Sequence, residues 1–237
     1  MRQHRLFAAL LLVLLASCSP GEPDRVTATD YDSFWLWAGI PPPPELQRAR
    51  NVYVLDGEIG GTPARWKPLR ASAPRTRGPQ IWLVVRTDTL DWPPRSAERL
   101  ADLADAWAAQ GNRVAGVQID FDARTRHLTD YVRFLANFRR VLPPRYRLSI
   151  TGLMDWSANG DPQALARLKG IVDEVVIQTY QGRSTIWGYE RYFARMRGFP
   201  VPFRIGLVEG GRWIEPEGLR SEPNFRGYVV FLLPPRG

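Results

Sequence analysis

The sequence is poor in the side chains that form covalent cross-links and bind soft metals. It has one cysteine and two histidines in 237 residues. The single cysteine, Cys18, cannot form an internal disulfide, so a disulfide-stapled fold is excluded. His4 lies in an N-terminal apolar leader, which leaves His127 as the one histidine of the mature chain. A histidine-based zinc site is therefore almost excluded.

Several catalytic signatures are missing as well. The sequence has no glycine-rich phosphate loop, no dinucleotide-binding fingerprint and no GxSxG turn for a serine nucleophile. Lysine is nearly absent, since Lys67 and Lys169 are the only two, and arginine carries the rest of the basic charge. We expect no cofactor.

What is present at the N-terminus predicts export. Residues 1–17 combine two arginines with the apolar run LFAALLLVLLAS, which is short for a membrane span and typical of a signal peptide. The quartet LASC that ends at Cys18 resembles the bacterial lipobox. The resemblance implies a lipoprotein whose Cys18 carries acyl chains such as palmitate. Ser19, in place of Asp, favours the outer membrane, facing the periplasm. The alternative is a plain secretory signal with an incidental cysteine.

The formal net charge of +8 fits this location. Outside the cytoplasm we expect no nucleic acid partner, and a basic surface favours anionic lipid or cell-wall surfaces. A solvated arginine surface is the simpler explanation. The expected partners are a carbohydrate or another cell-envelope component, with the membrane reached through the N-terminal lipid and the chain itself monomeric.

The pattern along the chain predicts one α/β domain. Residues 18–32 are polar with proline and glycine and indicate a tether after the lipidated cysteine, which leaves 33–237 for the domain. Eight short apolar runs indicate strands. They are 34–39, 51–58, 80–86, 114–122, 147–153, 174–180, 203–209 and 227–233.

Helical segments alternate with these strands. The candidates are 96–111, with Ser96 as N-cap; 127–142; 161–170, with Asp161 as N-cap; and 187–198. Strands that alternate with helices predict a parallel sheet, and eight of them predict a trimmed (β/α)8 TIM-like barrel. We expect no helix after strand two or strand eight. An open doubly wound sheet is the alternative.

Two carboxylates end the fourth predicted strand. Because side chains alternate along a strand, Ala115, Val117, Ile119 and Phe121 would face outward. Gly116, Gln118, Asp120 and Asp122 would then face the interior and the C-terminal mouth, where such barrels place their active sites. The sequence therefore predicts a site centred on Asp120 and Asp122.

The same parity test collects other polar residues at strand ends. In strand two, Asp56 and Glu58 fall on the side of Val52 and Val54. Further candidates for substrate binding are Arg86, Asp155, Trp156, Gln178 and Glu209, with Tyr180 as a catalytic candidate. Tryptophans near strand ends could serve as sugar platforms, although they are often core residues: Trp35, Trp37, Trp156 and Trp187.

Strand four resembles the DGxDxDxE motif of family-eighteen, chitinase-like glycoside hydrolases. In AGVQIDFD, Gly116 and Asp120 match, Gln118 replaces an Asp, and Asp122 stands in place of the acid Glu. In strand six, QTYQ resembles the family's Met-x-Tyr-Asp pattern at Tyr180 but lacks its Asp. The resemblance implies a barrel fold and a distant relation to carbohydrate hydrolysis. The shorter Asp side chain puts turnover in question.

A closer resemblance covers most of the mature chain. The segments FWLWAG, VYVLDGEI, IWLVVR, GVQIDFDARTRHLTDYVRFL, LSITGLMDW and VDEVVIQTYQGR resemble a bacterial family catalogued as domain of unknown function 3142. That family is predicted to be barrel-like and has no assigned activity, so the resemblance implies the architecture and leaves the function open.

Three functions remain. The first is a glycoside hydrolase in which Asp122 is the acid and Asp120 is its charge partner and orienter. Tyr180 would donate a hydrogen bond. A base would come from Asp56, Glu58 or Asp155. The second is a barrel that binds a glycan or a partner without turnover. The third is a hydrolase that holds Mg²⁺ or Ca²⁺ through the carboxylate oxygens of Asp120, Asp122, Asp56 and Glu58, which no loop motif supports.

Overall fold

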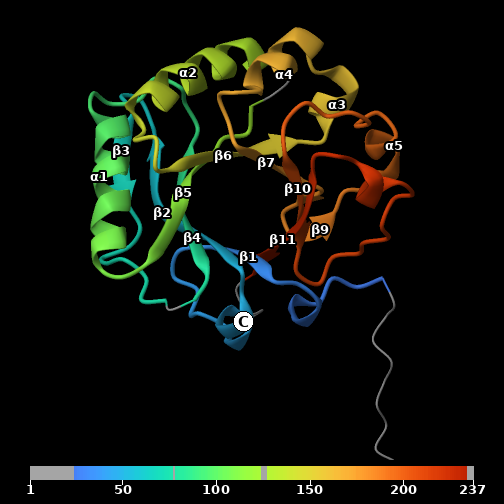
Figure 1. Ribbon diagram of the computed structural model, residues 1–237, viewed down its shortest axis with the longest axis horizontal. Helices are drawn as coiled ribbons and strands as arrows, with labels where there is room; N and C mark the ends of the chain where they lie inside the picture. Colours follow the sequence, from blue (N-terminus) through green and yellow to red (C-terminus); the bar gives the residue numbers. More distant parts are fainter. Residues whose placement is uncertain (1–23, 77, 124–126, 234–237) are drawn as a thin grey trace, which may run out of the picture.

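The computed structural model describes residues 24–76, 78–123 and 127–233, and it forms a closed barrel. Strand β1 pairs in parallel with both β2 and β11, so the ring order β1-β11-β10-β7-β6-β5-β4-β2 has no open edge. Figure 1 shows this ring with the helices outside it. The predicted TIM-like barrel is confirmed and the doubly wound sheet is excluded. The strands are β1 (Ser33–Leu36), β2 (Asn51–Gly60), β4 (Gln80–Thr87), β5 (Arg113–Asp120), β6 (Arg147–Leu153), β7 (Glu174–Gln178), β10 (Phe203–Val208) and β11 (Phe225–Leu232).

All eight predicted strands are present, and the two longest predicted helices pack as their periodicity indicates. Helix α1 (Ser96–Ala109) buries Leu100, Ala104 and Trp107 against the outside of the barrel. Helix α2 (Leu128–Val141) buries Leu128, Tyr131, Leu135 and Phe138 in the same way. In both helices these residues recur every three or four positions and so form one face.

The remaining connections are shorter than expected. Helix α4 (Pro162–Leu168) lies within the predicted 161–170, and α5 (Glu190–Phe193) is a single turn within the predicted 187–198. The short helix α3 (Asp155–Asn159) was not predicted. As expected, no helix follows β2. Strand β3 (Arg65–Pro68) pairs antiparallel with it instead. The other connections use 3-10 turns at Ala28–Asp30, Pro44–Arg48 and Leu219–Ser221 and a hairpin of β8 (Tyr180–Gln181) with β9 (Ser184–Thr185).

Helix starts show one prediction confirmed and one wrong. Asp161 caps α4 by accepting a hydrogen bond from the Gln163 amide at 2.9 Å. Ser96, in contrast, is the first residue of α1 rather than its N-cap. Its hydroxyl donates to the Pro93 carbonyl at 2.7 Å, and Arg95 occupies the cap with a φ of 64°.

A compact apolar cluster fills the barrel interior: Trp35, Tyr53, Leu55, Trp82, Val84, Val176, Val229 and Phe231. Parity predicted Val117 and Ile119 correctly as outward residues, but Ala115 packs against the interior cluster. The register of β4 against β5 shifts just before Gly116, and this shift reverses the parity of Ala115. A Cβ on Gly116 would lie 2.0 Å from the Arg147 carbonyl oxygen, so the close approach of β5 to β6 requires glycine there.

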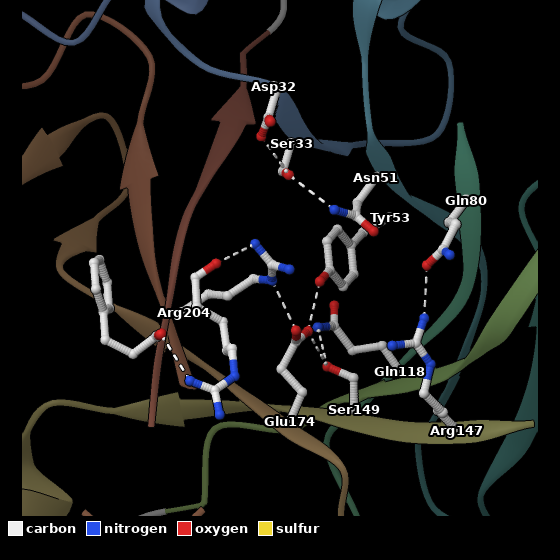
Figure 2. Close-up of polar contacts among 12 residues, drawn as sticks. Asp32, Ser33, Asn51, Tyr53, Gln80, Gln118, Arg147, Ser149, Glu174 and Arg204 are labelled. Atoms are coloured by element: carbon white, nitrogen blue, oxygen red, sulfur yellow. Dashed lines mark hydrogen bonds and ion pairs between the residues drawn. The ribbon is translucent and has the colours of Figure 1, made fainter. Parts of the chain in front are cut away.

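A buried ion pair occupies the N-terminal end of the barrel. Figure 2 shows Glu174 of β7 between Arg204, Tyr53 and Ser149. Arg204 Nε donates to Glu174 Oε2 at 2.7 Å, and the Tyr53 and Ser149 hydroxyls donate to Oε1 at 2.5 and 3.4 Å. Gln118 continues the network by donating to Ser149 at 2.9 Å. The polar side chains of this network are therefore satisfied by one another.

The chain before β1 packs against the barrel from Asp24 onward. The Val26 amide donates to Gly211 at 2.8 Å, the Gly210 amide donates to Val26 at 2.9 Å, and the Trp213 amide donates to Asp24 at 2.7 Å. Val26 and Ala28 are buried. Residues 24–32 therefore belong to the packed domain, not to a free tether as expected. The predicted signal peptide 1–17, Cys18 and the start of the tether lie outside the described residues.

Candidate functional site

A pocket of about 870 Å³ opens at the C-terminal ends of β2, β4 and β5. This is the end of a parallel barrel where active sites lie. Its volume falls within the range of ligand sites. The pocket is lined by Glu58, Ile59, Gly60, Gly61, Arg65, Trp66, Lys67, Pro68, Arg86, Thr87, Asp88, Asp120, Phe121 and Asp122.

Asp120 is the buried carboxylate of this pocket. Its side chain is 7% exposed at the end of β5. The Thr151 hydroxyl on the neighbouring strand β6 donates to Asp120 Oδ1 at 2.8 Å. The Arg86 guanidinium on β4 stands on the other side, with Nε 4.0 Å from Oδ2. The carboxylate thus has one short neutral hydrogen bond and one distant cation.

Burial raises the pKa of Asp120 from its ordinary value of 3.8 to about 6. The hydrogen bond from Thr151 and the charge of Arg86 lower this pKa, while the neighbouring charge of Asp122 raises it. The loss of hydration raises the pKa of Asp120 more than Thr151 and Arg86 lower it, because a guanidinium 4.0 Å away does not replace the lost water. Asp120 therefore exchanges a proton close to neutral pH.

Asp122 lines the same pocket but is exposed, because β5 ends at Asp120 and Asp122 lies in the following loop. The sequence analysis gave Asp122 the role of acid and Asp120 the role of charge partner. The structure gives the raised pKa to Asp120, so the proton-holding group is the inner residue. A parity argument could not show this, since it says nothing of where the strand ends.

Tyr180 completes the buried side of this region. It follows β7, and its ring packs on Phe231 with centroids 4.9 Å apart. Burial, followed by the charges of Asp120 and Asp122, raises the pKa of Tyr180 well above 10, and a hydrogen bond with Gln178 lowers it. Tyr180 therefore stays protonated, but it does not belong to the lining of the pocket that holds Asp120 and Asp122. Gln178 ends β7 beside it.

A β-bulge in β2 places Asp56 and Glu58 in different surroundings. The pairing of β2 with β4 skips Asp56, which restores Glu58 to the register of Arg86. Glu58 lines the pocket, with its carboxylate 3.9 Å from Lys67. Asp56 is buried and does not line the pocket. Burial raises the pKa of Asp56, and the charges of Arg70 and Arg99 partly offset this by lowering it. The two acids do not act as a pair.

The other predicted residues are dispersed. Asp155 begins α3 and accepts a hydrogen bond from Asn159 at 2.5 Å, and Glu209 accepts one from the Leu233 amide at 3.2 Å. Trp156 is 1% exposed and donates to the Ala123 carbonyl in the outer core. None of the three lines the pocket.

The four tryptophans proposed as sugar platforms also differ. Trp35 is fully buried in the barrel interior, where it donates to Gln118 at 2.8 Å, so Trp35 and Trp156 have no surface for a sugar. Trp37 lies just past β1, under the Arg86 guanidinium at 5.7 Å from the ring. Trp187 is 86% exposed but does not line this pocket.

The β2–β3 hairpin, which was not predicted from the sequence, supplies Arg65, Trp66 and Lys67 to the pocket wall. The Trp66 ring lies over Gly57, where a Cβ would come within 3.1 Å of it, and the Arg99 guanidinium stacks on it at 4.7 Å. The segment EIGGTPARW, a strand run followed by Gly-Gly-Thr-Pro, is a hairpin signal that could have revealed it.

Two further findings bear on the site. Among residues 24–76, 78–123 and 127–233, no three side chains of His, Cys, Asp or Glu gather closely enough to hold a metal ion. Within the same ranges, no helix has the length and apolar character needed to cross a membrane.

A family model described as Domain of unknown function (DUF3142) matches residues 81–188. This match confirms the family resemblance over strands β4 to β7, including Asp120 and Asp122. A comparison with curated proteins finds no match.

Three solved structures illustrate what the chain is similar to at low sequence identity. The chitinase domain of the spore coat protein CotE from Clostridium difficile is 14% identical, with a TM-score of 0.48 over 84% of this chain and 68% of that one. The xylanase and alpha-amylase inhibitor protein XAIP-II from Scadoxus multiflorus is 11% identical, with a TM-score of 0.47 over 77% and 83%. The spore cortex-lytic enzyme SleL from Bacillus cereus is 16% identical, with a TM-score of 0.47 over 80% of this chain and 52% of that one.

Proposed function

We propose that this chain is an envelope lipoprotein whose barrel mouth binds a carbohydrate and hydrolyses a glycosidic bond, with Asp120 as the proton donor. The observation that carries the proposal is the Asp120 carboxyl, buried at the floor of an 870 Å³ pocket with its pKa raised to about 6. A carboxylic acid that keeps its proton near neutrality is what a general acid requires.

The neighbouring groups support this assignment. Glycosidases work with two carboxyl groups in different environments, one protonated and one ionised. Asp120 is buried and Asp122 is exposed in the same pocket, so Asp122 takes the part of the ionised base or nucleophile. Tyr180, held protonated by burial, supplies a hydrogen-bond donor. These roles exchange the two aspartates relative to the order expected from sequence.

The pocket walls suit a sugar. Trp66 offers an aromatic side on the β2–β3 hairpin, and Arg86, Arg65 and Lys67 offer hydrogen-bond donors around it. The charged side chains of the lining, set beside the Trp66 and Phe121 rings, are the kind of placed polar group that orients a small ligand.

Binding without turnover is the second candidate, and the placement of the other acids favours it. Glu58 lies 3.9 Å from Lys67, and Asp88 is exposed beside Gly60. Of the other carboxylates in the lining of this pocket, Asp122 is the one whose charge acts on the pKa of Asp120. A loop position fixes a carboxylate less firmly than a strand does.

The test is release of reducing ends from a panel of envelope and storage glycans by the full chain. Asp120→Asn and Asp122→Asn should each abolish release, and Asp130→Asn, an exposed α2 residue paired with Arg133, is the matched control. Release that survives Asp120→Asn contradicts the assignment. No release by folded protein, together with saturable glycan binding that survives Asp120→Asn, supports the binding module.

The cellular location is part of the proposal. The apolar leader, the LASC quartet and Ser19 support a lipid on Cys18 and an outer-membrane protein facing the periplasm, acting as a monomer on a carbohydrate or envelope component. Labelled palmitate should enter the wild-type chain and not Cys18→Ser. Equal labelling of both chains contradicts the anchor.

A further inference from the structure

One side of the barrel carries an unusual surface that the proposed site does not use. We call it the β7–β10 rim and define it by residues 24–26, 183–195 and 210–214. Trp187 is 86% exposed and Ile214 is 55% exposed. Among the described residues, these are two of the three large hydrophobic side chains that are exposed, the third being Val141 on α2.

The three segments of the rim form one packed unit. The Arg212 amide donates to the Thr185 hydroxyl at 3.0 Å, and the Tyr189 hydroxyl bonds both the amide and the carbonyl of Ile214, at 2.6 and 2.8 Å. The Tyr189 ring stacks on Trp213 with centroids 4.7 Å apart. The exposed apolar side chains therefore stand on a fixed frame that a flat surface can contact without reordering it.

The charge of the rim is mostly positive. The Arg191 guanidinium lies over the Trp187 ring at 5.0 Å, and the acids of the rim are Asp24, paired with Arg212 at 3.3 Å, and Glu190. Its basic residues are Arg25, Arg183, Arg191, Arg195 and Arg212. A tryptophan flanked by arginines matches the headgroup level of an anionic membrane, where aromatic rings and basic side chains both gain.

The chain leaves the barrel at this rim. Asp24 pairs with the β10–β11 connection, and Cys18 lies six residues earlier. Six residues span at most about 20 Å. A lipid on Cys18 would therefore keep Asp24, and the rim on which it packs, within about 20 Å of the bilayer.

The pocket lies on the other side of the ring. In the ring order, β10 is four strands from β4 in either direction, and the pocket is built on β2, β4 and β5. Figure 1 shows β4 and β5 on the left and α5, β9 and the first described residues on the right. The rim follows the C-terminal ends of β7 and β10, so it shares the barrel mouth with the pocket but lies across the ring from it. A rim held at the membrane therefore keeps the pocket on the far side of the mouth.

We propose that the β7–β10 rim docks on an anionic lipid surface, with Trp187 at the headgroup level and Arg191 and Arg195 on lipid phosphates. The proposal rests on the anchored location in the proposed function, and it adds which face meets the membrane. Each arginine near an anionic surface strengthens binding about fivefold. Reversing two of them should therefore weaken rim contact by roughly twentyfold or more.

The experiment compares amide hydrogen exchange of the full lipidated chain in detergent, in phosphatidylcholine vesicles and in vesicles with about 30% phosphatidylglycerol. We expect slower exchange in 183–195 and 210–214 on the anionic vesicles, with the hairpin 58–68 unchanged. Arg191→Glu/Arg195→Glu should remove the slowing, and Arg133→Glu/Arg140→Glu on α2 should keep it. Unchanged exchange in the barrel strands verifies that each variant is folded.

Three results would overturn the proposal that the rim docks on anionic lipid. They are no slowing on anionic vesicles, equal slowing on neutral vesicles, and slowing produced by an anionic polysaccharide but by no vesicle. The mass of Cys18 is read from the same preparation. Protein without lipid refutes the anchor of the proposed function, whereas lipidated protein with an unprotected rim refutes the rim alone.

Discussion

The barrel interior holds an acid at each end, and the two are treated differently. Glu174 at the base and Asp120 at the mouth are each 6% exposed. Glu174 receives Arg204 at 2.7 Å and two hydroxyls, while Asp120 receives one hydroxyl at 2.8 Å and Arg86 at 4.0 Å. Equal burial with unequal partners separates an acid that stabilises the fold from one that is left reactive.

The largest effect is expected from breaking the Glu174–Arg204 ion pair at the N-terminal end of the barrel. Glu174→Gln leaves the Arg204 guanidinium buried without its carboxylate and should lower the free energy of unfolding by about 3–5 kcal/mol. Urea denaturation measures this. Asp105→Asn is the control, because it weakens an exposed pair with Arg145 at 2.6 Å and keeps an acceptor for the Tyr146 hydroxyl, so its effect on stability should be much smaller. Equal losses in both variants would deny the base its structural role.

Replacing Asp120 at the mouth should change the free energy of unfolding in the opposite direction. Because the folded-state pKa of Asp120 is raised from 3.8 to about 6, its contribution to stability is present below pH 4 and is lost as the pH rises through 6. Asp120→Asn should therefore raise the free energy of unfolding by up to about 3 kcal/mol near pH 7.5, and should not change it near pH 3.5. Denaturation at both pH values checks this. A loss of stability near pH 7.5 would show that Asp120 supports the fold.

A smaller effect isolates the distant cation. Arg86→Met removes the positive charge 4.0 Å from Asp120 and should raise the pKa of Asp120 further. Since the Arg86 side chain is 46% exposed, water screens it, and we expect a shift of about half a unit. The pH dependence of the stability difference from Asp120→Asn reports this shift. A downward shift would exclude Arg86 as a stabiliser of the ionised form.

The smallest effect concerns the outer wall of the site. The Tyr131 hydroxyl is buried and has no hydrogen-bond partner in the described structure, and the charges of Asp120 and Asp122 reach it. Tyr131→Phe removes an unsatisfied polar atom and should leave stability unchanged or raise it by about 1 kcal/mol. Thermal unfolding measures it, with Tyr53→Phe, which removes a bond to Glu174, as the destabilising counterpart.

Periodicity was sufficient to predict the barrel because each strand and each long helix must bury one face. The faces of α1 and α2 follow directly from Leu100, Ala104, Leu135 and Phe138. The same argument failed where the backbone departs from strict alternation. The bulge at Asp56 moved Glu58 to the side of Arg86, and the register shift before Gly116 turned Ala115 inward.

The site itself was predicted in part. Asp120, Asp122, Glu58 and Arg86 do meet in one pocket. Their division of roles depends on where β5 ends, which hydrophobic alternation leaves open. Trp66 was missed because the Gly-Gly-Thr-Pro segment after Glu58 resembles a loop, while the structure pairs β3 with the extended end of β2.

The docked residues 24–32 give the molecule a mechanical property. A pull on the chain ahead of Asp24 first meets the backbone hydrogen bonds between Asp24, Val26 and the 210–213 segment. These bonds form an antiparallel bridge, so they are loaded side by side before any force reaches β1. Strand β1 is only four residues long and closes the barrel between β2 and β11. The docked N-terminal segment therefore bears a pulling force on the chain before that force reaches β1, the strand that closes the barrel.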